Sequence, residues 1–119
     1  MSFMDDIGGR SALGEAVRDF FHRTEQDDSL SATLEGLDAG SMEDNQVEAI
    51  SAFLQDDEDG FVRQLRAAFR PMEDRGLSDD QFDGLYDHFH DAMIELGLPG
   101  GMVHEMLDKF EDLREQLVK

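Results

Sequence analysis

Apolar residues recur at the spacing of a helix through most of this sequence, and that spacing limits the folds open to it. Between residues 10 and 26, residues on one side of a helix recur every three or four positions: Leu13, Val17, Phe20, Phe21 and Thr24. No segment shows the strict alternation of apolar and polar residues that is typical of a half-buried strand. The pattern therefore predicts an all-α fold.

Start and stop signals divide the chain into helical segments. Ser78 and Gln81 have the spacing of a capping box, and Gly97 followed by Pro99 is a typical helix end. Pro71 is expected to end the helix before it, because the residue preceding a proline is disfavoured in the α conformation. The predicted helices cover residues 10–26, 29–35, 41–55, 61–69, 79–96 and 102–117, with an acidic loop at residues 56–60.

The charge balance is strongly acidic. The 119 residues include 29 Asp and Glu but only 10 Lys and Arg, which gives a formal net charge of −19. A surface of this sign repels phosphate backbones and anionic lipids, so binding to nucleic acids or membranes is not expected. Because apolar residues recur at helical spacing, we interpret the acidity as a halophilic surface and not as disorder. Salt screens the repulsion between carboxylates, so the melting temperature should fall when salt is removed.

Length and composition set further limits. A chain of 119 residues is expected to form one domain, residues 1–119, around a modest hydrophobic core. Without cysteine it offers no disulfide, no thiolate metal site and no cysteine nucleophile. The amino-terminal stretch lacks the basic and apolar parts of a secretion signal, and no apolar run is long enough for a membrane span. We therefore expect a cytoplasmic protein.

Two local motifs resemble metal sites without completing one. With Gly60 at the sixth position of a calcium loop, Gln55 and Arg66 would occupy the first and twelfth positions, where calcium needs carboxylates. His104 and Asp108 have the spacing of two zinc ligands, but no third ligand is indicated. We expect a solvated acidic loop and an exposed helix face instead. Neither a metal site nor an enzymatic role is predicted.

Several short motifs follow one another in a recognisable order. Residues 7–9 read Ile-Gly-Gly, residues 76–83 read Gly-Leu-Ser-Asp-Asp-Gln-Phe-Asp, and residues 97–99 read Gly-Leu-Pro. In this order the motifs resemble the opening, the entry to the G helix and the G–H turn of the truncated (two-over-two) haemoglobins, most closely their first group. The resemblance covers nearly the whole chain. It implies a globin-like two-over-two helical sandwich, haem b and the binding of a small gas.

The residue that holds the iron in that family has no counterpart here. The family binds iron through a histidine shortly before the G-helix phenylalanine, which corresponds to Phe82. In that family the histidine lies about ten residues before the phenylalanine, and counting back ten residues from Phe82 gives Met72. Counting forward from Val47 of the expected E helix without a gap gives Phe69 instead. In either register the ligand is missing, because no histidine occurs between His22 and His88.

Other positions of the expected haem pocket differ as well. By the same resemblance, Phe21 replaces the distal tyrosine, Leu34 replaces a phenylalanine that packs against the porphyrin, and Met42 takes the early E-helix distal position. Gln46 lies where the E helix often carries a glutamine. These residues would line a haem pocket, or fill the same space as core if no haem binds.

Two functions remain open. In the favoured one, ordinary haem and oxygen binding has been lost and no cofactor is bound. The protein then acts as a haem-free interaction, regulatory or apolar-ligand-binding module, whose partner is an unknown protein or an apolar small molecule; a homo-oligomer is a further option. In the alternative, haem b is retained through Met72, alone or together with Met42, for gas sensing or electron transfer.

Overall fold

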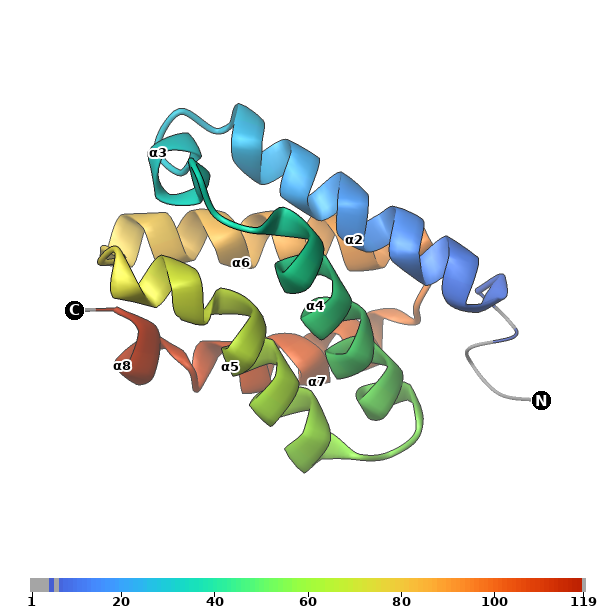
Figure 1. Cartoon of the computed structure of the whole chain (residues 1–119). Coiled ribbons are helices and arrows are strands. Elements are labelled where there is room, and N and C mark those ends of the chain that lie inside the picture. The colour runs from blue at the N-terminus through green and yellow to red at the C-terminus, as the bar shows by residue number, and fades with distance from the viewer. Residues whose placement is uncertain (1–4, 6, 119) are drawn as a thin grey trace.

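The computed structural model describes residue 5 and residues 7–118, so part of the amino-terminal stretch considered above lies outside the described residues. Helices pack around a common interior, as Figure 1 shows. They are α2 (Gly9–Gln26), α3 (Ser31–Leu34), α4 (Ala39–Leu54), α5 (Glu58–Asp74), α6 (Asp79–Leu96), α7 (Gly100–Glu111) and α8 (Arg114–Leu117). The described residues form no strand, although one isolated parallel bridge joins Leu77 and Val118. The predicted all-α fold is confirmed.

Polar side chains and glycine define the helix ends. The hydroxyl of Ser78 accepts a hydrogen bond from the N–H of Gln81 at 3.1 Å, and the Gln81 side chain accepts one from the N–H of Ser78 at 2.9 Å. The predicted capping box therefore opens α6. Gly97 ends α6 in the left-handed conformation, with φ of 96°. Asp38 caps α4, which consequently begins earlier than predicted, at Ala39.

The acidic run at residues 56–60 is only partly a loop, which corrects the prediction. Asp57 is the N-cap of α5, and its carboxylate accepts a hydrogen bond from the N–H of Gly60 at 2.9 Å. Glu58 and Asp59 lie in the first helical turn, where negative side chains interact favourably with the helix dipole. The acidity that suggested a solvated loop therefore helps to start a helix.

Pro71 does not end its helix, contrary to the prediction. α5 continues through Pro71 to Asp74, although proline in a helix interior costs about 3 kcal/mol. Phe69 and Met72 are both completely buried. Burying a side chain of this kind contributes about 1.5–3 kcal/mol. Burial of the residues around the proline therefore offsets the local penalty.

Two further helix boundaries differ from those predicted. The segment 29–35 keeps only the short helix α3, because Ser29 donates two hydrogen bonds to the carboxylate of Asp27 and is held in a turn. The segment 102–117 is divided into α7 and α8, with the break at Asp112 and Leu113.

Aromatic rings hold the helices together. Phe110 of α7 has its ring centroid 5.2 Å from those of Phe82 and Phe89, 5.5 Å from that of Phe69 and 6.0 Å from that of Tyr86. These edge-on and tilted pairs connect α5, α6 and α7. α2 packs against both α6 and α4, and α8 packs against α5. The core is therefore continuous from the first described helix to the last.

Two arginines join the helices at the surface. Arg23 of α2 pairs with carboxylates of α2 and α6, and Arg114 of α8 pairs with carboxylates of α6 and α7. The partners are Asp19, Asp91 and Glu95 for Arg23, and Asp79, Asp83 and Glu111 for Arg114. Hydrogen bonds, chiefly those to Glu95 and to Glu111, raise the pKa of the two guanidiniums. None of the described helices is both long and apolar enough to cross a membrane.

Candidate functional site

The residues predicted to line a haem pocket all lie in the interior. They are contributed by α2, α3, α4 and α5: Phe21, Leu34, Met42, Gln46, Phe69 and Met72. All are buried, and the most exposed of them, Leu34, keeps 9% of its surface accessible. The apolar members belong to one hydrophobic cluster. Gln46 follows Met42 by one helical turn, so both residues project from the same face of α4.

α4 and α5 are the helices between which the resemblance would place a haem ring. They pack against each other more extensively than any other pair of described helices, and they form a hairpin in Figure 1. Hollows of about 460 and 490 Å³ lie at the surface instead, and neither is lined by any of the six predicted residues. The apolar residues of the predicted pocket are therefore part of the hydrophobic core.

Phe20 belongs to this interior, although the resemblance gave no reason to place it at the predicted pocket. Its ring centroid lies 5.0 Å from that of Phe21, 5.9 Å from that of Phe69 and 6.1 Å from that of Phe89. Phe20 thus connects α2 with α5 and α6. The helical stripe of residues 10–26 predicted that Phe20 is buried, but not that it packs against one of the two alternatives for the iron-ligand position.

Gln46 is a polar side chain enclosed in this apolar interior. Its exposed fraction is 0%, and neither its amide oxygen nor its amide nitrogen has a hydrogen-bond partner among the described residues. An unpaired buried amide group costs about 1–3 kcal/mol. Gln46 is therefore the one feature of the predicted pocket that a polar guest would stabilise.

The histidines of the chain do not reach this interior. His22, His90 and His104 are exposed, and His88 is half-buried, with its Nε2 2.9 Å from the Oδ2 of Asp27. Hydrogen bonds from Ser29, and next from His88, lower the pKa of the Asp27 carboxyl. His88 thus joins α6 to the end of α2. Since these four are the only histidines in the sequence, the residues present do not fit a haem held by histidine.

Methionine sulfur is the remaining type of iron ligand in this part of the core. Met42 lies in the first turn of α4 and Met72 in the last turn of α5. Because α4 and α5 form a hairpin, both residues lie at its open end, away from the connecting turn. Met42 is 1% exposed and Met72 is 0% exposed. The register question is unaffected, because Phe69, the other alternative, is equally buried.

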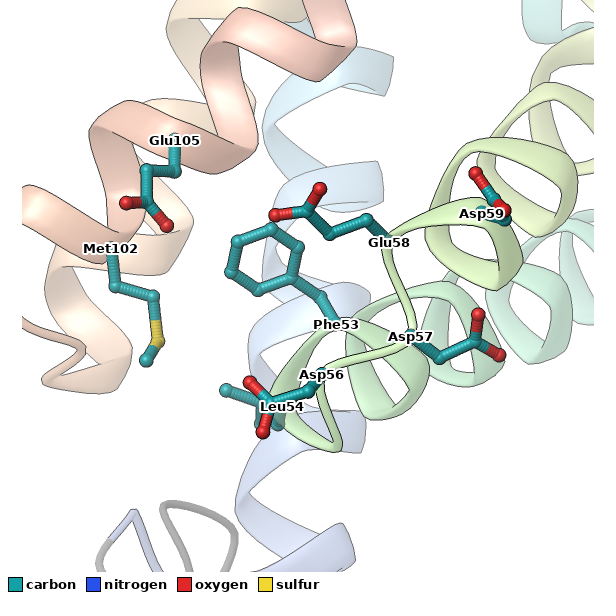
Figure 2. A pocket seen from close by; sticks show the side chains of 8 residues that line it. All are labelled: Phe53, Leu54, Asp56, Asp57, Glu58, Asp59, Met102 and Glu105. Atoms are coloured by element: carbon teal, nitrogen blue, oxygen red, sulfur yellow. The ribbon is translucent and has the colours of Figure 1, made fainter.

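An acidic cleft lies at the closed end of the same hairpin. It encloses about 460 Å³ between the α4–α5 turn and α7, and is lined by Phe53, Leu54, Asp56, Asp57, Glu58, Asp59, Met102 and Glu105. Figure 2 shows that the carboxylate of Asp57 points away from Met102 and Glu105. Within the described residues, no group of three or more His, Cys, Asp or Glu is placed to hold a metal ion. The carboxylates of this cleft do not converge on a common point.

Comparison with known proteins identifies matches that cover almost the whole chain. The family model described as bacterial-like globin matches residues 2–119. The group 1 truncated hemoglobin GlbN of Mycolicibacterium paratuberculosis (strain ATCC BAA-968 / K-10) is 29% identical over 120 residues, which cover 98% of this chain and 83% of that protein. Together with the all-α architecture, the match over almost every residue shows that this chain belongs to the bacterial-like globin family.

Proposed function

We propose that this protein is a globin whose interior is closed by its own side chains, and that it acts without a histidine-held haem. The direct packing of α4 against α5, with Phe69 and Met72 completely buried between them and the rest of the core, is the observation that carries the proposal. A protein of this kind works through its surface, as an interaction or regulatory module, or by taking up an apolar small molecule. No enzymatic role is proposed.

The acidic surface is part of the same proposal. A formal net charge of −19 suits a cytoplasm with strong salt, where ions screen the repulsion between carboxylates. Thermal unfolding followed by circular dichroism from molar to millimolar salt tests this point. We expect the melting temperature to fall as salt is removed, and an unchanged melting temperature would contradict a halophilic surface.

Titration of the purified protein with hemin, in the salt that keeps it folded, tests the closed interior. We expect no sharp Soret band and no change in melting temperature, because α4 packs directly against α5 and both Phe69 and Met72 are completely buried. The Met72→His variant distinguishes two explanations for the absence of haem binding: a missing iron ligand and a pocket filled by side chains. If only the ligand had been lost, this variant would gain a sharp Soret band. A stoichiometric Soret band in the unchanged protein would overturn the proposal.

The alternative is a haem held through methionine, and the unpaired amide of Gln46 favours it. A thioether from Met72, alone or with Met42, would be the iron ligand, and haem bound in this way supplies redox or gas-binding chemistry at a raised potential. Gln46 would then donate a hydrogen bond to a polar guest in the interior. This account requires a Soret band that Met72→Ala removes and that Met106→Ala, a variant of a buried methionine of α7, retains.

A further inference from the structure

A shallow groove runs along the outer face of α5, opposite the side that packs into the core. It encloses about 490 Å³, and three arginines of α5 line it together with apolar side chains: Arg63, Arg66, Arg70, Val62 and Ala67. Gln116 of α8 and Asp59, from the first turn of α5, are also part of its lining. A volume of this size is within the range of small-molecule sites in proteins.

Within residue 5 and residues 7–118, the three arginines have no acidic partner, although the chain is rich in acids. All three are exposed, and none forms a hydrogen bond or ion pair within the described residues. By contrast, Arg10, Arg23 and Arg114 each contact a carboxylate. With 29 acidic residues against 10 basic ones, three neighbouring unpaired arginines form a local exception. Their guanidiniums are available to an anion that comes from outside the chain.

The spacing of these arginines suits a ligand with more than one anionic group. Residues 63, 66 and 70 lie on one face of a helix and span about 10 Å along its axis. Each guanidinium can bind a carboxylate or phosphate group through two parallel hydrogen bonds. Val62, Ala67 and the aliphatic stems of the arginines provide an apolar wall beside the charges. The groove thus offers separated cations along an apolar strip.

The charge of the remaining surface restricts the size of the ligand. The chain as a whole carries a net charge of −19, so a long polyanion, such as a nucleic acid, would be repelled by the carboxylates outside the groove. A small anion can stay within the groove and avoid them. Asp59 lies at the Arg63 end, which favours the stronger anionic contact near Arg66 and Arg70.

We propose that the α5 groove binds a small organic dianion, that is, an apolar skeleton carrying two carboxylate groups. The apolar wall selects for the skeleton, and the row of guanidiniums selects for the two charges. The site lies outside the core and does not depend on what the interior holds. Failure of the hemin test and failure of this proposal are therefore separate results.

Isothermal titration calorimetry with octanedioate tests the site on the intact protein, in the lowest salt at which circular dichroism shows full helicity. We expect saturable binding with one ligand per chain. Arg66→Gln should weaken it about fivefold or more, because a charge-assisted pair is lost. Arg18→Gln removes the same charge from an exposed position on α2 and should leave binding unchanged. Circular dichroism of both variants excludes unfolding as the cause.

Three further ligands define the chemistry of the site. Octanoate, which has a single carboxylate, and tripolyphosphate, which has no apolar skeleton, should both bind more weakly than octanedioate. Equal or tighter binding of either one would overturn the assignment of an organic dianion. Tighter binding of a hexaglutamate peptide would identify an acidic protein segment as the ligand and reject the small molecule. The absence of saturable octanedioate binding, or an equal loss in Arg66→Gln and Arg18→Gln, would reject the site itself.

Discussion

Around α6 and α7 the interior consists of aromatic rings in mutual contact, whereas between α4 and α5 it encloses polar and flexible groups. On the first side, Phe110 contacts four other rings, and the Ser78 capping box fixes the start of α6. On the second side, the amide of Gln46 has no hydrogen-bond partner among the described residues, and α5 runs through Pro71. Capping residues start helices on both sides, but the first side adds complementary aromatic packing, whereas the second contains an unpaired amide and an interior proline. Under the proposal of a closed interior, the change would concern the α4–α5 side, while the α6–α7 side would maintain the fold.

The largest effect is expected from Phe110→Ala, which breaks the aromatic side. The variant removes the ring that connects α5, α6 and α7. Deleting a buried ring of this size lowers the free energy of unfolding by about 3–5 kcal/mol. Guanidinium unfolding followed by circular dichroism measures the loss. Phe53→Ala is the matched variant near the α4–α5 turn, because Phe53 is 7% exposed and its ring pairs with that of Phe61. An equal or larger loss in Phe53→Ala would contradict the contrast between the two sides.

A smaller effect, of opposite sign, is expected from Gln46→Leu. Leucine has a similar size and leaves no unpaired amide, so the free energy of unfolding should rise by about 1–3 kcal/mol if the interior is closed. Gln64→Leu, at a half-buried position of α5, controls for added apolar surface. Destabilisation by Gln46→Leu alone would indicate that the amide has a partner in solution, and would favour the account in which the interior takes a guest.

The smallest effect concerns the junction between α2 and α6, as a function of pH. Hydrogen bonds from Ser29 and from His88 lower the pKa of Asp27 in the folded protein. The stability that they contribute is therefore fully present above the unfolded value of about 3.9, and is lost as the pH falls through the lowered folded value. Asp27→Asn should lower the free energy of unfolding by about 1 kcal/mol near neutral pH. The loss should become progressively smaller below a pH of about 4. Asp28→Asn, on the exposed neighbour, should show no such trend.

The same contrast explains which parts of the structure could be predicted. The limits of α6 follow from Ser78, Gln81 and Gly97, because capping and left-handed ends depend on residues that are close in the chain. The course of α5 through Pro71 could not be predicted, because it depends on burial against distant helices. Met72 and Phe69, the two alternatives for the iron-ligand position, are both completely buried, and their role remains a prediction.

Two features of the candidate sites were not accessible from the sequence for a related reason. The glutamine at position 46 was recognised, but whether its amide has partners depends on every side chain around it. Arg63, Arg66 and Arg70 form a helical row that the sequence shows, but the strongly acidic composition gives no reason to predict a basic groove. Only the structure shows that no carboxylate of the described residues pairs with them and that Gln116 of α8 borders the same groove.

The start of α5 also constrains how this sequence can change over time. A Cβ atom added at Gly60 would collide with the carboxylate of Asp57, which accepts the capping hydrogen bond from the N–H of Gly60. A mutation at Gly60 alone therefore displaces the cap, whereas the same mutation is tolerated once position 57 holds a smaller residue. The two codons are expected to vary as a pair across descendants of this gene, with the change at 57 occurring first.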